Sequence, residues 1–300
     1  MQSDSNPDPL SSGGVIPPTV TAFHGDESVD YGTTAAHARF VVDRGVDGVF
    51  PLGTNGEFAL LDAEESVGVI EAVVDEVGGE VPVIAGVGAV STYHTVRNAE
   101  RAADAGADGV MIVTPYYYPL DDEGAIEHYQ RVADAIDLPI YVYHIPGRTG
   151  NELSRGTLAE LAEIDAIAGI KDSSKDVPWL GQTIATNPDL TVLPGADSLQ
   201  FVGRVLGGVG GVSAIANAFP EIVVDLHDAY DAGDRDRARD LQETLYRIRA
   251  AFDKGPYMAG VKGALSLQGF DAGPLRSPLR RLTDEQKNEL ERDLQGLGVL

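Results

Sequence analysis

The sequence predicts an α/β protein, a (β/α)8 TIM barrel followed by a C-terminal helical extension. Short apolar segments rich in β-branched residues recur eight times, and segments with helical periodicity separate them. An internal repeat supports the same plan, because residues 44–49 resemble residues 105–110, two βα units of about 30 residues later. Eight such units in about 220 residues match the usual size of this barrel.

Each predicted strand is short and apolar, as expected of a parallel strand that is covered on both faces. The eight predicted strands are 15–20, 48–52, 82–87, 110–113, 139–145, 167–170, 190–193 and 209–215. A doubly wound open sheet is the competing fold. It would have fewer strands and a glycine-rich dinucleotide turn, whereas Gly86-Val-Gly88 after the third strand lacks the third glycine.

The helices are predicted from periodicity and capping residues. The clearest covers 62–77, where Asp62 and Glu65 have the spacing of a capping box, and residues 91–105 repeat its plan. Three helices after the last strand are predicted at 234–252, 256–268 and 284–294. The predicted organisation is a disordered polar tail (1–14), the barrel (15–230) and C-terminal helices packed on it (231–300), with no linker to a second core.

Composition excludes several classes of protein. The chain has 300 residues, 43% of them hydrophobic, and no cysteine, which excludes a disulfide scaffold, thiolate metal sites and a cysteine nucleophile. Its six histidines show no HxxxH or HExxH spacing, so we expect no metal. The first fourteen residues have no basic start or apolar core, and no segment approaches the roughly 18 to 20 apolar residues of a membrane span. We expect a cytoplasmic protein.

The charge balance is strongly acidic. Asp and Glu number 47 and Lys and Arg 22, giving a net charge of −25, which argues against nucleic acid and anionic membranes as partners. Only five of the basic residues are lysines, and the acids are spread along the whole chain. This pattern favours a halophilic surface, on which salt screens the repulsion between carboxylates; an ordinary acidic protein is the alternative.

In such a barrel the site lies at the carboxyl ends of the strands. The turn at 53–58, Gly-Thr-Asn-Gly-Glu-Phe, offers free backbone N–H groups to a small anion, or is simply a barrel turn. The three tyrosines at 116–118 are candidate site residues or an aromatic anchor between subunits, although ordinary loop packing is the simpler interpretation.

The fifth and sixth predicted strands end in reactive side chains. Tyr143 can act as an acid or base, and Arg148 beyond it can clamp a carboxylate or pair with an acid of the chain. Period-two alternation places His144 on the opposite face, as a structural residue. Lys171 ends an apolar strand, where desolvation would make it a neutral nucleophile; a lysine that reaches out to solvent is the alternative.

Four motifs together resemble one family: GTNGE at 53–57, PYYYP at 115–119, YHIPGRTG at 143–150 and GIKDSS at 169–174. In order and spacing they are similar to those of the dihydrodipicolinate synthase / N-acetylneuraminate lyase family of class I, Schiff-base aldolases, over about 15–282. The resemblance implies a barrel with C-terminal helices and a homotetramer built as a dimer of dimers. It also implies no cofactor, because the substrate binds covalently as an imine.

The resemblance assigns the catalytic roles. Lys171 matches the lysine that forms the imine with pyruvate or another 2-keto acid. Tyr143 matches the tyrosine that relays protons, and Thr54 matches the hydroxyl that links it to a second tyrosine. Tyr117 matches that second tyrosine, which reaches into the neighbouring subunit's site in family dimers.

Binding residues follow from the same resemblance. The backbone amides of Thr54 and Asn55 would hold the pyruvate carboxylate, while Gly195 and Val212 match positions that line the pocket. Arg148 matches the arginine with which the synthases hold the semialdehyde carboxylate. The expected partners are therefore a small 2-keto acid and an aldehyde.

The substrate is predicted from departures within these motifs. Asn55 replaces the second threonine of the synthases and His144-Ile145 replaces their Asn-Val, while the PYYYP loop is similar to that of 2-keto-3-deoxy sugar-acid aldolases. We therefore expect cleavage of 2-keto-3-deoxygluconate or its 6-phosphate. Arg148 favours the alternative, 4-hydroxy-tetrahydrodipicolinate synthase, and Leu120 replaces an arginine that some sugar-acid aldolases use for phosphate. A dehydratase, and a non-catalytic 2-keto-acid sensor or assembly subunit, are further alternatives.

Overall fold

The computed structural model describes residues 7–300, which form seven parallel strands and twelve α-helices around one barrel. The strands are β1 (Gly14–Ile16), β2 (Ile84–Gly86), β3 (Gly109–Val113), β4 (Ile140–His144), β5 (Ile167–Asp172), β6 (Thr191–Pro194) and β7 (Gly210–Val212). Strands β2 to β6 form one sheet in chain order, β1 pairs with β7, and β6 packs beside β7. The predicted (β/α)8 fold is confirmed.

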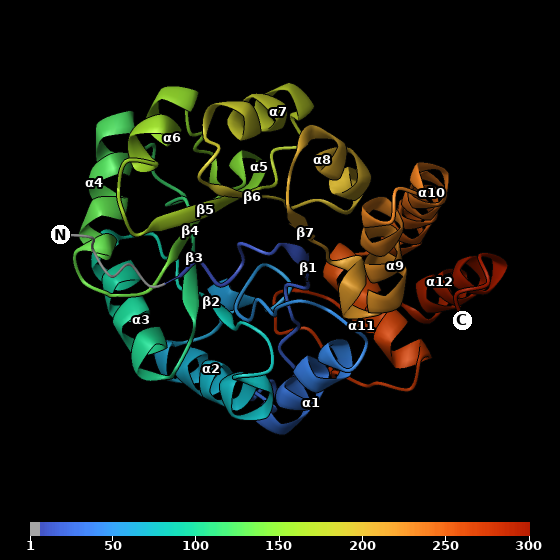
Figure 1. Ribbon diagram of the computed structural model, residues 1–300. Helices are drawn as coiled ribbons and strands as arrows, with labels where there is room; N and C mark the ends of the chain where they lie inside the picture. Colours follow the sequence, from blue (N-terminus) through green and yellow to red (C-terminus); the bar gives the residue numbers. More distant parts are fainter. Residues whose placement is uncertain (1–6) are drawn as a thin grey trace.

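The helices surround the strands in chain order, and the last three lie outside this ring beside α9 (Figure 1). They are α1 (Tyr31–Val42), α2 (Ala63–Val77), α3 (Thr92–Asp104), α4 (Asp122–Ala133), α5 (Pro146–Thr149), α6 (Arg155–Leu161), α7 (Val177–Thr186), α8 (Gln200–Leu206), α9 (Pro220–Asp231), α10 (Arg235–Phe252), α11 (Tyr257–Leu267) and α12 (Asp284–Gly296). The predicted capping box is present at the start of α2, where Asp62 and Glu65 bond each other's backbone N–H.

The second predicted strand, 48–52, is wrong as a continuous strand. Within the described residues it forms only an isolated parallel bridge from Val49 to Val83, although it lies in the barrel position between β1 and β2. Its N–H groups still reach both neighbours, since Val49 donates to the carbonyl of Pro82 at 2.9 Å and Phe50 to that of Pro17 at 3.0 Å. The prolines at the crossing points have no N–H, which interrupts the ladder.

The prediction of a disordered tail over 1–14 is wrong for residues 7–14. Leu10 is only 1% exposed and joins the apolar cluster inside the barrel. The Asp8 carboxylate accepts hydrogen bonds from the hydroxyls of Tyr141 and Thr191, at the starts of β4 and β6. The segment therefore closes the amino-terminal end of the barrel, because the Leu10 side chain is buried in the apolar interior there. Residues 1–6 lie outside the described part of the chain.

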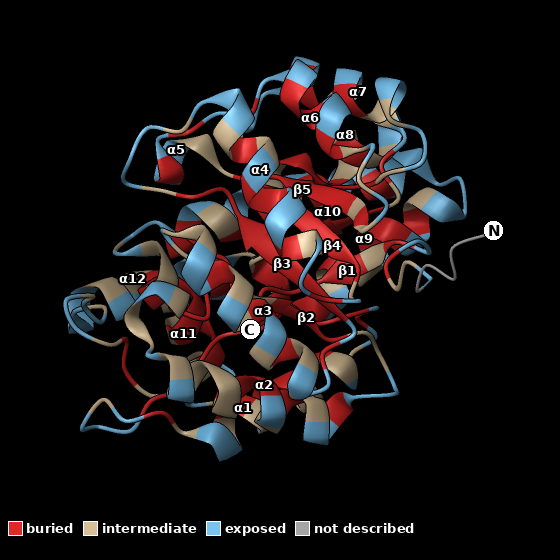
Figure 2. Ribbon diagram, turned by 90° about the vertical axis from the view of Figure 1, so that its left-hand side faces the viewer, coloured by how far each residue is buried: buried red, intermediate tan, exposed pale blue. Residues whose placement is uncertain are grey.

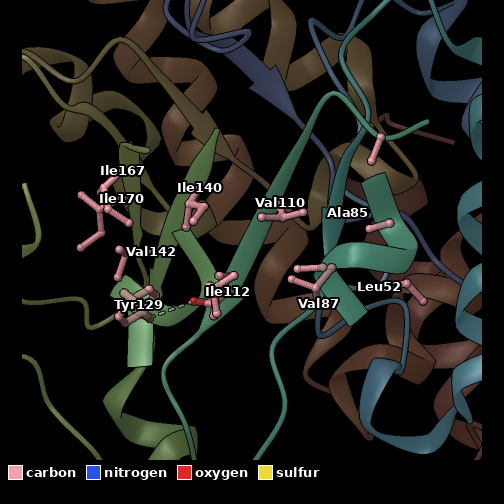
Figure 3. Packing of buried hydrophobic residues seen from close by; sticks show 14 of the residues in the cluster. Leu52, Ala85, Val87, Val110, Ile112, Tyr129, Ile140, Val142, Ile167 and Ile170 are labelled. Atoms are coloured by element: carbon pink, nitrogen blue, oxygen red, sulfur yellow. Dashed lines mark hydrogen bonds between the residues drawn. The ribbon is translucent and has the colours of Figure 1, made fainter. Parts of the chain in front are cut away.

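Alternate residues of each strand face different parts of the core. Figure 3 shows Val110, Ile112, Ile140 and Val142 packed toward the surrounding helices, with Tyr129 of α4 donating a hydrogen bond to the Ile112 carbonyl at 3.1 Å. The buried strands lie between exposed outer faces of helices (Figure 2). Met111 on β3 and Tyr141 on β4 alternate with these four residues. They point inward and belong to the cluster that fills the barrel interior.

Candidate active site

Tyr143 and Lys171 face each other inside the barrel, at the carboxyl ends of neighbouring strands. They are direct partners in the parallel register of β4 and β5, so both side chains leave the sheet on its inner face. Lys171 Nζ lies 3.5 Å from the centroid of the Tyr143 ring and 5.0 Å from that of Phe50. The two residues are 3% and 4% exposed, so the amine sits among aromatic rings and away from bulk water.

This environment changes the acidity of both groups. Burial lowers the pKa of Lys171, because desolvation disfavours the ammonium form. Burial alone would raise the pKa of Tyr143, but the neighbouring Lys171 charge and the contact with Thr54 outweigh it and lower the pKa of the phenol. A lower pKa increases the share of neutral Lys171 amine, which can attack a carbonyl, and the adjacent phenol can exchange protons with the adduct.

Thr54 connects the turn at 53–57 to this pair. Its Oγ1 lies 3.2 Å from the Tyr143 hydroxyl. The N–H groups of Thr54 and Asn55 have no acceptor within residues 7–300, and Asn55 Nδ2 is buried without a partner in the same part of the chain. Because buried donors are normally satisfied, these three groups form a fitting cradle for a carboxylate.

Glu57, the last residue of this turn, anchors it from behind. It is 3% exposed and has a left-handed backbone with a φ of 56°. Its Oε1 lies 2.9 Å from Lys262 Nζ of α11, and its Oε2 accepts the Arg276 N–H at 2.9 Å. Burial raises the pKa of Glu57, and Lys262 opposes that shift. The turn that carries Thr54 is thereby tied to the C-terminal helices.

Gly195 follows β6 and packs directly against the lysine. A Cβ at this position would lie 2.1 Å from Ser173 Oγ and 2.9 Å from Lys171 Cε. A side chain at this position would force Ser173 Oγ or the Lys171 side chain to move, so the close approach of this backbone favours glycine. Val212, at the end of β7, is 1% exposed and completes this side of the barrel mouth.

A cavity of about 250 Å³ opens at this end of the barrel. It brings together seven of the eight predicted site residues: Thr54, Asn55, Tyr143, Arg148, Lys171, Gly195 and Val212. Tyr117 is the exception, because it does not line the cavity and is 82% exposed beside Tyr118. A separate hollow of about 300 Å³ between α2 and α3 shares no lining residue with this cavity.

Eleven further residues that line the cavity were not predicted. Lys175 and Asp197 follow β5 and β6, where the rule of carboxyl strand ends could have found them. Arg249 and Tyr257 come from α10 and α11, which that rule does not cover. Arg249 Nη1 lies 3.3 Å from Asp197 Oδ2, and its guanidinium carbon lies 3.7 Å from the centroid of the Tyr257 ring.

The described residues 7–300 contain no cluster of three or more His, Asp or Glu side chains that could hold a metal ion. Over the same residues no helix is long and apolar enough to cross a membrane. His144 lies on the outer face of the barrel, bonded to Asp172 and stacked on Trp179. It does not line the cavity, which agrees with the structural role predicted for it.

Comparison with known proteins identifies the family that this chain matches. The profile of the dihydrodipicolinate synthetase family matches residues 11–297. A relative from Halobacterium salinarum, described as an uncharacterized DapA-like lyase, is 66% identical over 98% of this chain and 96% of its own. The 4-hydroxy-tetrahydrodipicolinate synthase of Haloarcula marismortui is 38% identical over 92% of this chain and 91% of its own.

A solved structure agrees with the fold over nearly the whole chain. YagE, a prophage protein of the dihydrodipicolinic acid synthase family from E. coli K12, was crystallised in complex with pyruvate. It superimposes with a TM-score of 0.92 and 34% identity, covering 96% of this chain and 99% of its own.

Proposed function

Because the chain belongs to the dihydrodipicolinate synthetase family of class I aldolases and lyases, we propose that it cleaves a 2-keto-3-deoxy sugar acid, such as 2-keto-3-deoxygluconate or its 6-phosphate, to pyruvate and an aldehyde. The observation that carries the proposal is the buried contact of Lys171 Nζ with Tyr143 inside the cavity. The reaction needs no cofactor, because the substrate itself is bound to Lys171 as an imine.

The chemistry begins with the neutral Lys171 amine, which attacks the C2 carbonyl of the keto acid. Loss of water gives a protonated imine, which accepts the electron pair of the C3–C4 bond as that bond breaks. The C4 hydroxyl loses its proton and becomes the aldehyde carbonyl. The resulting enamine takes a proton at C3, and water then releases pyruvate and restores the amine.

Tyr143 is the residue placed to move these protons. Its hydroxyl contacts Thr54 Oγ1 at 3.2 Å, so a proton taken from the C4 hydroxyl can pass along this pair. The keto-acid carboxylate fits the donors of Thr54 and Asn55, which holds C2 beside Lys171. Gly195 leaves room for the lysine to bend toward that carbon.

The PYYYP loop at 115–119 supports a sugar acid over aspartate semialdehyde as the source of the aldehyde part, because it is similar to that of 2-keto-3-deoxy sugar-acid aldolases. Asn55, in place of the second threonine of the synthases, favours the same substrate class.

Borohydride trapping with pyruvate in concentrated KCl tests the imine, with peptide mapping of the adduct. We expect a reduced pyruvate adduct on Lys171, the same adduct in Lys287→Met, and none in Lys171→Met. Pyruvate release from 2-keto-3-deoxygluconate or its 6-phosphate then identifies the lyase. Condensation with aspartate semialdehyde without sugar-acid cleavage would identify the synthase. A folded wild type without adduct would favour the sensor or assembly subunit.

We also propose that the protein is a homotetramer in which Tyr117 completes a neighbouring site. Tyr117 and Tyr118 are 82% and 68% exposed and their ring centroids lie 5.0 Å apart, so they project from the rim. Tyr117 also has a left-handed φ of 80°. Light scattering in concentrated KCl should give four times the chain mass of 31.7 kDa. A monomer with full activity would refute a role for Tyr117 across subunits.

A further inference from the structure

A carboxylate from the amino-terminal segment joins the two strands that flank β5. The Tyr141 hydroxyl of β4 donates to Asp8 Oδ1, and the Thr191 hydroxyl of β6 donates to Asp8 Oδ2 at 2.5 Å. Gly169 of β5 lies between them, as the register partner of both Tyr141 and Thr191. These two hydrogen bonds, which we call the carboxylate bridge, connect strands that are not paired with each other.

The carboxylate bridge lies one layer beneath the reactive side chains. Residues two positions apart on a strand point to the same face and are about 7 Å apart along it. Two positions beyond the bridged level, the three strands carry residues that are again register partners: Tyr143, Lys171 and Leu193. The separation of β4 and β6 at the bridge is therefore passed on to the strand neighbours of Lys171.

Tight packing over Gly169 couples the bridge to β5 itself. A Cβ on this glycine would lie 2.3 Å from the Thr191 carbonyl oxygen and 3.0 Å from Tyr141 Cδ1. The Tyr141 ring thus occupies the space where a side chain of β5 would lie, and it is completely buried. Because protein interiors are close-packed and transmit displacements, a shift of this ring moves β5 two residues before Lys171.

The ladder between β4 and β5 is interrupted just before this level. Its register shifts by one residue there, so that Ala168 is skipped. A bulge of this kind bends the strand and disrupts the local pairing. Tyr141 and Gly169 form the first pair after the bulge, and the carboxylate bridge holds that pair. The register that brings Lys171 opposite Tyr143 is therefore supported by a contact from outside the ladder.

The Asp8 carboxylate is held in place by its own segment. The Leu10 N–H donates to Asp8 Oδ1 at 2.9 Å. The Ser11 N–H and Oγ donate to the Asp8 carbonyl at 3.2 and 2.8 Å. The Leu10 side chain is buried in the same apolar cluster as Tyr141. The carboxylate is therefore a fixed acceptor at this end of the barrel.

Filling the end of the barrel does not by itself require a carboxylate. An apolar residue at position 8 could also cover it, since replacing both partners of a buried hydrogen bond by apolar groups can be nearly neutral for stability. A fixed separation of two hydroxyls, by contrast, needs an acceptor between them. Burial and the Asp8 carboxylate raise the pKa of Tyr141, so the phenol keeps its proton and remains a donor. Asp8 also precedes residue 11, where the match to the family profile begins.

We propose that Asp8 is a positioning residue for imine formation. By holding β4 and β6 at a fixed separation, it keeps Lys171 and Tyr143 aligned for attack on the keto-acid carbonyl. The inference rests on the proposed aldolase function, but only on its imine step, so it holds for any aldehyde partner.

The rate of imine formation with pyruvate tests this role. Rapid mixing in concentrated KCl, a borohydride quench and intact mass give that rate, which is divided by the folded fraction. In Asp8→Ala we expect the rate at saturating pyruvate to fall about ten-fold, because misaligned groups react slowly. The pyruvate concentration for the half-maximal rate should stay within about two-fold, since the donors of Thr54 and Asn55 belong to a different turn.

Two milder variants keep the test informative if Asp8→Ala does not fold. Tyr141→Phe keeps the ring and loses only the donor, so it should slow imine formation several-fold. Asp8→Asn retains one acceptor oxygen and should recover part of the rate. Asp8→Ala combined with Tyr141→Phe should be no slower than Asp8→Ala alone, because both changes remove the same contact.

Val41→Ala is the matched control for a loss of stability. Val41 is fully buried on α1, in a core cluster that contains neither Tyr141 nor Leu10. This variant should lower the urea midpoint and leave the rate per folded molecule unchanged. An equal loss of rate in Val41→Ala would overturn the proposal, because the rate would then follow stability alone.

The wild-type reaction separates this inference from the proposed function. Equal rates in wild type, Asp8→Ala and Tyr141→Phe would overturn the positioning role and leave the aldolase standing. A wild type that forms no adduct at any pyruvate concentration would refute the aldolase and the inference with it.

Discussion

His144 and Asp172 form a buried hydrogen-bonded pair on the outer face of the barrel, with Nδ1 3.0 Å from Oδ1. They are register partners one step beyond Tyr143 and Lys171, so the two pairs occupy opposite faces of the same strand ends. The Leu153 N–H donates to His144 Nε2 at 3.3 Å, which leaves Nδ1 as the donor to the carboxylate. We therefore expect the outer pair to hold the spacing of the inner, reactive pair.

Replacing Asp172 with Ala should therefore reduce both stability and imine formation. The change leaves the His144 and Ser174 donors without an acceptor, which costs about 2 to 4 kcal/mol of unfolding free energy. We expect the rate of pyruvate trapping on Lys171 to fall about ten-fold in the folded variant, because a small displacement of the amine misaligns its attack. Urea unfolding and trapping kinetics measure the two effects, and Asp189→Ala on the surface is the control. Normal trapping in a destabilised variant would make the pair purely structural.

Gly195→Ala should slow imine formation strongly, with little change elsewhere. The added methyl would lie 2.9 Å from Lys171 Cε and closer still to Ser173 Oγ, so the lysine must rotate away from its aromatic walls. We expect a loss of at least about 100-fold in trapping rate, as for a misplaced reacting group. Gly25→Ala is the matched control, because nothing lies within 4 Å of its Cβ. Trapping at the wild-type rate in Gly195→Ala would contradict the close packing of Gly195 against Lys171.

The buried ion pair of Glu57 and Lys262 should control the turn that binds the carboxylate. Both side chains are at most 6% exposed, and removing one partner leaves the other charge buried. We expect Glu57→Gln to lower unfolding stability by about 3 kcal/mol and to raise KM for pyruvate more than it lowers kcat. Glu64→Gln, at an exposed position on α2, provides the control. An unchanged KM would show that the ion pair stabilises the C-terminal helices without positioning Thr54.

Much of the site could be predicted because its signals are local. The site of such a barrel lies at the carboxyl ends of its strands, and this rule finds the lysine that ends an apolar strand. Period-two alternation along the neighbouring strand then finds Tyr143. Arg249 could not be found in this way, because its place in the cavity depends on how α10 docks against the barrel. Leu10 was missed for a similar reason: a single leucine in a polar segment carries no periodicity, and only the open end of the barrel gives it a burial site.

Three buried histidines should make the fold sensitive to acid. Burial lowers the pKa of His37, His128 and His227 from the ordinary 6.5 to about 4. As the pH falls through 6.5, these three histidines bind protons in the unfolded chain and stay neutral in the folded chain. The free energy of unfolding therefore declines from there down to about pH 4. Each should cost about 1 kcal/mol of unfolding free energy between pH 7 and 5.5.

Urea unfolding at a series of pH values measures this slope. His128→Gln should flatten it by about one third, as expected if the three histidines contribute equally. His24→Gln is the control, because His24 is exposed and its Nδ1 lies 3.7 Å from the Asp30 carboxylate. Equal slopes in wild type and His128→Gln would show that His128 becomes protonated in the folded state without penalty.

Salt should stabilise the fold far more than it does an ordinary protein. The net charge of −25 on 300 residues destabilises the folded state, because folding brings the like charges closer together and they repel each other. The screening length falls from about 10 Å at 0.1 M salt to about 3 Å at 1 M, so most of this repulsion disappears. The halophilic relatives from Halobacterium salinarum and Haloarcula marismortui agree with this expectation.

Thermal unfolding should shift upward by roughly 10 °C or more between 0.1 and 2 M KCl. Equimolar sucrose, which is excluded from the surface but screens no charge, should give a smaller shift. Equal midpoints in dilute buffer and in 2 M KCl would refute adaptation of this surface to salt.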